Sequence, residues 1–221
     1  MEHFTLDPSR SWEYENGYFL TCDTSRIGKM LNHLEIYKKI LHLPGDVAEF
    51  GVYKGPSLMR LLAFRHLLEQ DFSRKIFGFD IFGKFPENLA LPEDRAFVER
   101  FEAAGGHGIH VKELEQLIQR KGYQHVELIA GDIMETLPAF LQKEPARRFA
   151  LIHIDVDVFE PTEKILALLW DKMVPGGIVM LDDYGTVAGE TLAVDAFIRQ
   201  HGLTLQKPPY NHIPAYFVKP L

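Results

Sequence analysis

Five acidic residues each follow an apolar run that is typical of a buried β-strand. Parallel strands covered on both faces read as continuous apolar runs, and ligands of open α/β sheets bind outside the carboxyl ends of the strands. A carboxylate at this edge on every strand is more than solubility requires. The pattern indicates a nucleoside-type cofactor on one half of the sheet and a metal or other cationic centre on the other. The five residues are Glu49, Asp80, Asp132, Asp155 and Asp182.

The first half of the predicted sheet carries the candidate cofactor site. The run Glu49–Gly55 links the first strand to a helix, and its glycines let the backbone approach a ligand. The run departs from the dinucleotide pattern G-x-G-x-x-G, because Glu49 stands two residues before Gly51 where a glycine would be expected. A carboxylate in this turn repels a pyrophosphate but not a cationic cofactor that bears an amino acid. Asp80 is placed to accept hydrogen bonds from ribose hydroxyls, and Asp132 could meet an adenine amino group.

S-adenosylmethionine fits this pattern, because it has a ribose, an adenine and a cationic centre but no phosphate. The protein then has mainly to position its reactive methyl group and a nucleophile. Each acid alone could be an ordinary loop residue, so the interpretation depends on their occurring together. The candidate cofactor-binding residues are Glu49, Gly51, Tyr53, Gly55, Asp80 and Asp132.

The second half carries the candidate metal site, formed by Asp155, Asp182 and Asp183. Neighbours in a strand point to opposite faces, so Asp182 and Asp183 converge only if the strand ends there and the chain turns. Three carboxylates in one pocket repel each other unless a cation lies between them. All-oxygen ligation selects Mg²⁺, with Mn²⁺ or Ca²⁺ as alternatives. Such an ion lowers the pKa of a substrate hydroxyl, and Asp155 could be both ligand and general base.

The local signals leave a second interpretation of these acids open. An Asp-Asp pair after a strand is often a turn followed by a helix cap, and Asp157 could simply solvate a loop. His153 is expected to be a strand residue within the sheet.

The elements that position these residues alternate between strand and helix patterns. Parallel strands are predicted at 47–51, 75–80, 126–130, 149–154 and 178–181, the last entered through a turn at 175–177. Helices are predicted at 24–41, 56–70, 95–104, 111–119, 135–142, 160–172 and 190–201. The segments 203–206 and 215–219 resemble a terminal hairpin. This order predicts a doubly wound, Rossmann-like α/β fold with a mostly parallel sheet and a C-terminal antiparallel hairpin.

The chain has 221 residues, which fits one domain. We expect residues 23–221 to form it and residues 1–22, which are rich in aromatic side chains, to be a lid or a tail. Residues 81–110 are too many for a plain connection and are a candidate substrate loop. The apolar stripe of the helix at 24–41 could form a homodimer interface or pack on its own sheet.

The composition excludes several classes of partner. The net charge of −7 argues against nucleic acid or an anionic membrane as the main partner. No stretch approaches the roughly 20 apolar residues of a membrane span, and the amino terminus lacks the apolar core of a signal peptide. A single cysteine, Cys22, cannot form an internal disulfide, which fits a cytoplasmic protein.

Five segments, in order from Gly45 to Gly185, together resemble the macrocin O-methyltransferase family. Its members are class I, S-adenosylmethionine-dependent, metal-assisted enzymes that methylate sugar hydroxyls of natural products. The resemblance implies cofactor contacts by Glu49, Gly51, Asp80 and Asp132. It also implies a magnesium site at Asp155, Asp182 and Asp183, with Asp155 as the base. The segments are GDVAEFGVYKGPS, FGFDIFGKFPE, GDIMETLP, IHIDVDVFEPT and PGGIVMLDDYG.

The leading hypothesis is therefore an O-methyltransferase that acts on a hydroxyl of a sugar-bearing or polyhydroxylated small molecule. The chain departs from the family pattern at Pro56 and at residues 156–159, and the acceptor is left open because the lid regions determine it. One alternative is a metal-independent small-molecule N- or O-methyltransferase. Another is a non-catalytic protein that binds S-adenosylmethionine as a scaffold. Glu49 disfavours a nicotinamide dehydrogenase.

Overall fold

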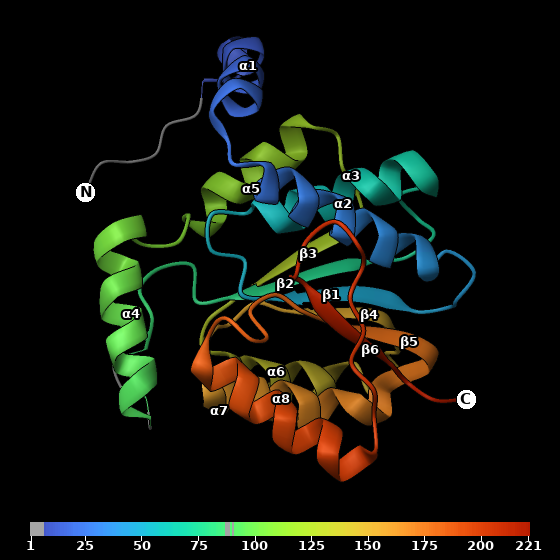
Figure 1. The fold of residues 1–221 in the computed structure, drawn as a ribbon. Coiled ribbons are helices and arrows are strands. Elements are labelled where there is room, and N and C mark those ends of the chain that lie inside the picture. Colours follow the sequence, from blue (N-terminus) through green and yellow to red (C-terminus); the bar gives the residue numbers. More distant parts are fainter. Residues whose placement is uncertain (1–6, 87–88, 90) are drawn as a thin grey trace.

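A six-stranded sheet forms the centre of the protein, in the strand order β3-β2-β1-β4-β5-β6 (Figure 1). The computed structural model describes residues 7–86, 89 and 91–221. The first five strands are parallel and β6 pairs antiparallel with β5, which confirms the predicted fold class. The strands are β1 (Asp46–Phe50), β2 (Ile76–Asp80), β3 (Val126–Ala130), β4 (Phe149–Ile154), β5 (Met173–Leu181) and β6 (Ala215–Val218).

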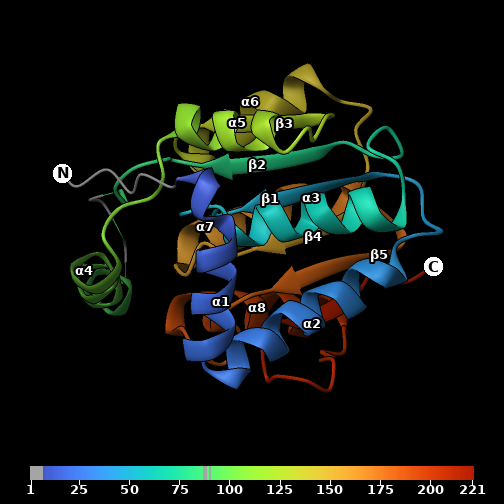
Figure 2. The same ribbon diagram turned by 90° about the horizontal axis from the view of Figure 1, so that it is seen from above.

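Helices cover both faces of the sheet and bury an apolar cluster on each (Figures 1 and 2). One face packs against α2 (Thr24–Lys39), α3 (Pro56–Leu68) and α5 (Val111–Arg120). The other packs against α6 (Ile133–Lys143), α7 (Phe159–Leu169) and α8 (Ala188–His201). Ile36 and Tyr37 of α2, and Ile40 directly after it, are fully buried in the first cluster, so this part of the apolar stripe packs on the protein's own sheet.

Local capping fixes where several of these helices begin and end. The Asp23 carboxylate accepts a hydrogen bond from the Ser25 amide at the start of α2, and the Asp132 carboxylate accepts one from the Met134 amide at the start of α6. Pro56 occupies the first turn of α3, where its missing N–H costs nothing. Gly202, in a left-handed conformation, ends α8.

Two details of the C-terminal half differ from the sequence prediction. The Pro175-Gly176-Gly177 run is not a turn that precedes the strand but lies inside β5, where the register against β4 shifts between Phe149 and Leu151. The segment 203–206 is not a strand. It contributes a single bridge, between Gln206 and Tyr216, so the antiparallel partner of β6 is β5.

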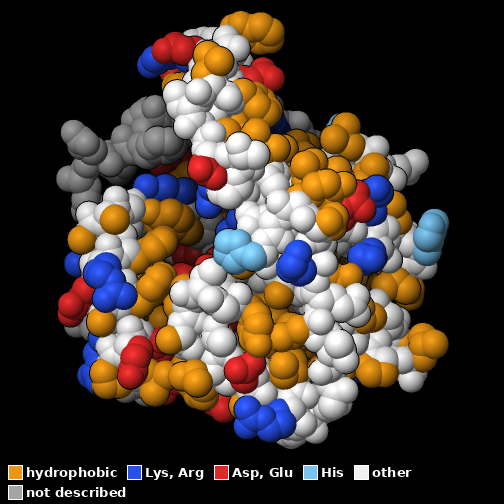
Figure 3. All heavy atoms as spheres, in the orientation of Figure 1, with side chains coloured by type: hydrophobic (Ala, Val, Ile, Leu, Met, Phe, Trp, Pro, Cys, Tyr) orange, Lys and Arg blue, Asp and Glu red, His pale blue; other side chains and the backbone are white. Residues whose placement is uncertain are grey.

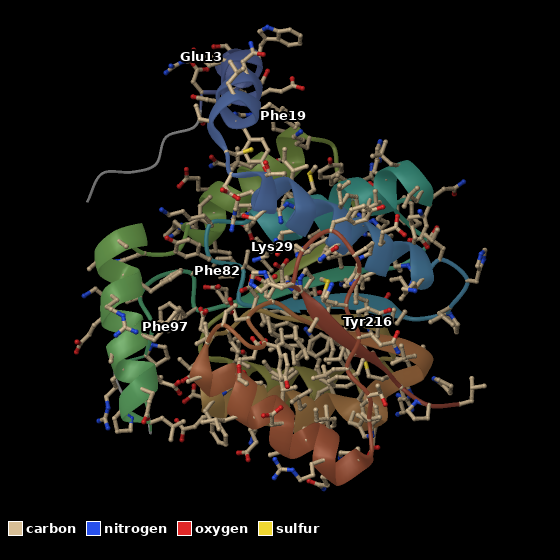
Figure 4. All side chains as sticks on the ribbon, in the orientation of Figure 1. Glu13, Phe19, Lys29, Phe82, Phe97 and Tyr216 are labelled. Atoms are coloured by element: carbon tan, nitrogen blue, oxygen red, sulfur yellow. The ribbon has the colours of Figure 1, made fainter. Side chains whose placement is uncertain are left out.

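Residues 11–21 form a helix that the sequence pattern did not predict. This helix, α1 (Ser11–Thr21), follows a short 3-10 turn, η1 (Pro8–Arg10), and buries none of its residues. Its apolar side chains are spread around the axis, so no helical period was visible. Trp12, Phe19 and Leu20 are exposed, and Figure 4 shows Glu13 and Phe19 on the helix that projects beyond α2. The part of the predicted lid before residue 7 lies outside the described residues.

A second helix stands beside the sheet rather than on either face. This helix, α4 (Pro92–Gly105), lies in the predicted substrate loop, of which residues 87, 88 and 90 are outside the described part (Figure 1). It joins neither large apolar cluster, and Val98 packs with Leu89 and Val158 in a small cluster of its own. Among the described residues, no helix has the length and apolar character needed to cross a bilayer.

Candidate active site

A cavity of about 540 Å³ opens at the carboxyl ends of the parallel strands. Ligand sites of this fold lie at that edge, and the volume is in the range of small-molecule sites. In Figure 3 acidic side chains lie inside a hollow that has Lys and Arg side chains on its rim. Of the predicted site residues, Glu49 and Gly55 do not line the cavity. Those that line it are Gly51, Tyr53, Asp80, Asp132, Asp155, Asp182 and Asp183.

Backbone hydrogen bonds hold the strand ends level with one another. The Asp155 amide donates to the Phe50 carbonyl over 2.8 Å, and the Asp182 amide donates to the Ile154 carbonyl over 3.0 Å. On the other side of β1, the Gly51 amide donates to the Phe79 carbonyl over 2.9 Å. These bonds continue the ladders past the strands and bring residues that are far apart in sequence to one edge.

Asp80 holds the turn that leads into α3. One oxygen of its carboxylate accepts hydrogen bonds from the amides of Val52 and Tyr53, at 2.7 and 2.9 Å, and the other accepts one from Phe82. An ionised carboxylate has about four lone-pair sites, so these three bonds leave room for one more partner. The predicted contact with a ribose hydroxyl therefore stays a prediction, alongside a structural role that the sequence did not reveal.

Glu49 is fully buried behind the cavity wall. Its carboxylate lies 3.3 Å from Nδ1 of His153, and neither carboxylate oxygen has a hydrogen-bond partner among the described residues. Protonated His153 is thus the charged partner of Glu49, although the contact is too poorly aligned to satisfy either carboxylate oxygen with a hydrogen bond. The predicted contact between Glu49 and the cofactor is not tested by this arrangement.

The remaining predicted cofactor residues have defined local roles. Tyr53 has a left-handed backbone conformation and donates a hydrogen bond from its hydroxyl to the Gly105 carbonyl over 2.6 Å. Gly55 packs under α5, where an added Cβ would lie 2.9 Å from Cδ1 of Leu114. Asp132 lines the cavity while it caps α6.

Asp155, Asp182 and Asp183 come together as predicted. One carboxylate oxygen from each lies within 4.8 Å of the other two. β5 ends at Leu181, so the chain turns at Asp182 and both acids reach the same place, as the alternation of strand side chains required. Oxygen donors at these separations can converge on one hard divalent ion such as Mg²⁺.

Two further acids border this cluster that sequence analysis had not assigned to it. Asp157 does not solvate a loop but is buried, with a positive φ of 64° and its carboxylate against that of Asp183. Glu190, fully buried on α8, accepts a hydrogen bond from the Asp183 amide over 3.1 Å. Glu190 lies in a helix, so the rule that acids end strands could not have found it.

Burial and mutual repulsion dominate the electrostatics of the acid cluster. Burial raises the pKa of Asp155 well above its usual value, and the negative charges of Asp182 and Asp183 add to this. Burial also raises the pKa of Asp183 and, strongly, that of Asp157. Carboxylates in this state need protons or a cation to lie close together, and the donor set fits a divalent metal.

Asp182 behaves differently because cationic and hydrogen-bonding groups surround it. The Lys29 ammonium, which reaches down from α2, forms an ion pair with one of its oxygens (Figure 4). Nε2 of His153 and Nε2 of His33 lie 3.3 and 3.4 Å from the other. Burial acts to raise the pKa of Asp182, but these neighbours hold it well below its usual range. His153 is thus a buried strand residue, as predicted, that bridges Asp182 and Glu49.

We expect the metal-free protein to lose stability as the pH rises from about 6.5 to 9. Burial acts to lower the pKa of His153, but contacts with Asp182 and Glu49 outweigh it and raise this pKa to about 9. The positive charge of His153 therefore contributes its full stabilisation below pH 6.5, and this contribution is lost as the pH rises to 9. The raised pKa of Asp155 acts in the same direction, because its ionisation is unfavourable in the folded state. Burial lowers the pKa of His33 to about 4, so protonation of this residue affects stability only below pH 6.5.

Thermal unfolding in a chelating buffer between pH 6.5 and 9 measures this effect. Saturating Mg²⁺ should flatten the profile, because a cation offsets the charge that ionisation creates. A midpoint that stays level or rises with pH in the chelating buffer contradicts the expectation.

Aromatic side chains of α4 and of the segment before it also line the cavity. They are those of Phe97 and Phe101 of α4, whose ring centroids are 5.7 Å apart, and of Phe85. Phe97 is labelled in Figure 4 on the inner side of α4. The cavity thus combines an acidic end with an apolar surface that can hold a ring or an aglycone.

The strand order and the ligand cavity at the carboxyl edge define the class I methyltransferase fold. Solved structures share it across nearly the whole chain. The calicheamicin methyltransferase CalS11 matches with a TM-score of 0.80 and 27% identity, over 96% of this chain and 86% of that one. The O-methyltransferase NovP matches with a TM-score of 0.75 and 20% identity, over 88% and 81%. At the latter identity the likeness shows the fold alone.

Residues 23–218 match the family model of macrocin O-methyltransferase (TylF), and the chain belongs to this family. A relative from Streptomyces olivaceus is 33% identical over 150 residues, which are 64% of this chain and 54% of the relative. It is named as an 8-demethyl-8-(2,3-dimethoxy-alpha-L-rhamnosyl)-tetracenomycin-C 4'-O-methyltransferase. A demethyldecarbamoylnovobiocin O-methyltransferase from Streptomyces niveus is 28% identical over 65% of this chain and 54% of its own length. The chain thus spans about half the length of these curated relatives.

Proposed function

We propose that this protein is an S-adenosylmethionine-dependent, metal-assisted O-methyltransferase that acts on a hydroxyl of a sugar-bearing or polyhydroxylated small molecule. The convergence of Asp155, Asp182 and Asp183 at the cavity is the observation that carries the proposal. The raised pKa of two of these acids supports a site that binds a cation. Family membership supports methyl transfer as the reaction.

The two halves of the cavity would hold different ligands. Gly51, Asp80 and Asp132 would hold S-adenosylmethionine, which supplies a methyl group on a sulfonium. Gly51 has no side chain between its backbone and the cavity, and the nearby Glu49 carboxylate, which contacts His153 without a hydrogen bond, would attract the cationic end of the cofactor. A divalent ion held by Asp155 and its two partners would lower the pKa of the acceptor hydroxyl.

Within this site, Asp155 would take the proton of the acceptor hydroxyl at a carboxylate oxygen. A general base must come within hydrogen-bond reach of the proton that it takes, and Asp155 lines the cavity in which the acceptor would lie. Lys29, His33 and His153 keep Asp182 ionised and fixed, so that the acids have unequal roles. The apolar wall at Phe97 and Phe101 would exclude water and orient the acceptor.

The names of relatives suggest acceptors for a first panel. One relative methylates a rhamnosyl group of a tetracenomycin, and a CalS11 structure, 25% identical to this chain, is described as a TDP-rhamnose 3'-O-methyltransferase. The panel therefore contains a nucleotide-activated rhamnose and a rhamnosylated aromatic compound. They represent the sugar before and after its transfer to an aglycone. Methylation of either, located by mass spectrometry, would identify the sugar hydroxyl as the target.

Lys29 favours a second candidate, a methyltransferase that needs no metal. Its ammonium pairs with Asp182 and is attracted by Asp155 and Asp183. A cation supplied by the chain itself could neutralise the acids and stabilise a developing alkoxide. Methyl transfer that is unchanged in excess chelator would favour this candidate over the metal-assisted one.

Calorimetric titration with S-adenosylhomocysteine, with and without Mg²⁺, tests the proposed function. We expect micromolar binding of S-adenosylhomocysteine and a separate heat for Mg²⁺ in the unaltered protein, because the two ligands occupy different halves of the cavity. The Mg²⁺ heat should disappear in Asp183→Asn, while the surface variant Asp171→Asn keeps it. If S-adenosylhomocysteine does not bind, the methyltransferase proposal is wrong.

A further inference from the structure

Three cationic side chains line the active-site cavity on the side of α2 and α3. Arg26 and Lys29 are three residues apart on α2, so they lie on the same side of that helix. Arg60 extends from α3 and is close enough to Arg26 for their charges to repel. Cations from two helices thus meet at one wall of the cavity.

Only one of the three has an acidic partner at contact distance. Lys29 pairs with Asp182. Among residues 7–86, 89 and 91–221, no ion pair or side-chain hydrogen bond involves the guanidinium group of Arg26 or Arg60. Burial lowers the pKa of Arg60 and Arg26 lowers it further, although Asp182 and Glu49 act in the opposite direction from a distance.

Arg60 is half-buried in the cavity wall and Arg26 is exposed beside it, so the cost of desolvation falls on Arg60. A buried cation without a partner costs free energy, and arginine binds planar anions such as carboxylate and phosphate through paired N–H donors. None of the acids that line the cavity contacts either arginine: Asp80 holds the turn before α3, and Asp182 pairs with Lys29. The two arginines therefore place positive charge at the cavity, and no acidic side chain of the described residues contacts either of them.

We propose that Arg26 and Arg60 form a binding site for an anionic group of a ligand in the active-site cavity. The inference rests on the proposed function, which supplies two ligands that can carry such a group. One is the carboxylate at the amino-acid end of the cofactor, and the other is a phosphate or carboxylate on the acceptor. The shared chemistry is a multidentate oxyanion that accepts hydrogen bonds from guanidinium.

Binding of three probes to the unaltered protein and to matched variants tests the site. The probes are S-adenosylhomocysteine, 5'-methylthioadenosine, which lacks the amino-acid end, and inorganic pyrophosphate, each titrated by calorimetry. The variants are Arg60→Met, Arg26→Met and Arg60→Lys. The last keeps the positive charge but loses the paired N–H donors of the guanidinium group. Arg199→Met, on the exposed side of α8, is the control. Circular dichroism and thermal unfolding identify variants that remain folded.

We expect Arg60→Met to weaken binding of one anionic probe by at least about tenfold, the scale of a lost charge-assisted hydrogen bond. Arg60→Lys and Arg26→Met should have intermediate effects, and they carry the test if Arg60→Met does not fold. Weaker S-adenosylhomocysteine binding with unchanged 5'-methylthioadenosine binding assigns the site to the cofactor carboxylate. Weaker pyrophosphate binding alone assigns it to an anionic acceptor.

The inference and the proposed function can fail separately. If S-adenosylhomocysteine binds and no probe distinguishes the arginine variants from Arg199→Met, the anion site is wrong and the proposed function stands. If S-adenosylhomocysteine does not bind the unaltered protein, the proposed function is wrong, and the pyrophosphate titrations alone decide the anion site.

Discussion

Asp155→Asn is expected to lower kcat for methyl transfer by about 100- to 10,000-fold, the usual range for loss of a general base. Asp182→Asn should be similarly damaging, because it removes one of the three proposed ligands at the site where the acceptor hydroxyl would be activated. In both variants the affinity for S-adenosylhomocysteine should stay within about threefold of the unaltered protein, since the turn at Gly51 and Asp80 is untouched. Single-turnover kinetics and calorimetry on the same preparations measure the two effects.

The two variants should differ in stability, which separates electrostatics from simple damage. Asp155→Asn removes a negative charge that burial and the neighbouring acids make unfavourable. The thermal unfolding midpoint of this variant should therefore be higher than that of the unaltered protein in a chelating buffer. Asp182→Asn leaves Lys29 and His153 without their negative partner and should lower the midpoint. Normal turnover by either variant after metal removal would exclude the metal-assisted mechanism.

Gly51→Ala is expected to destabilise the fold by several kcal/mol and to abolish binding of S-adenosylhomocysteine. Gly51 has a φ of +89°, and an added Cβ would lie 1.8 Å from the carbonyl oxygen of Asp155. The methyl group cannot be accommodated unless β1 and β4 separate at the edge that forms the cavity. The loss of unfolding free energy should therefore exceed the roughly 1 kcal/mol that a positive φ alone costs a residue with a side chain.

Gly185→Ala is the matched control for this experiment. Gly185 also has a positive φ, of +81°, but an added Cβ there meets nothing within 4 Å. The difference in unfolding free energy between the two variants in urea isolates the clash from the backbone strain. Equal unfolding free energies would show that the close approach of Gly51 to Asp155 is not required for the fold.

Much of the site could be predicted because strand ends are visible in sequence. Continuous apolar runs mark the parallel strands, and the acids that follow them meet at one edge by topology alone. Asp155, Asp182 and Asp183 were found in this way. The alternation rule even gave the condition for Asp182 and Asp183 to converge, which the end of β5 at Leu181 satisfies.

The residues that were missed come from helices or act through contacts between elements. Lys29 and Arg60 lie on helix positions that look like ordinary solvated cations in sequence. His153 lies beside Asp182 because β4 pairs with β5, and His33 reaches the same carboxylate from α2. Glu190 could not be linked to Asp183 before the path of the chain from β5 into α8 was known.

The separate position of α4 has a consequence for how this protein can diverge. The helix supplies Phe97 and Phe101 to the cavity, on the side proposed for the acceptor, yet no residue of it belongs to either of the large apolar clusters on the sheet. Substitutions of Phe97 and Phe101 would then alter which molecules fit while both of these clusters stay intact. Acceptor choice could then change between relatives without changing the core of the sheet. A graft of Pro92–Gly105 from a relative that keeps Asp94, which bonds to the Phe159 amide, and Gly105, which bonds to Tyr53, is accordingly a route to a new specificity.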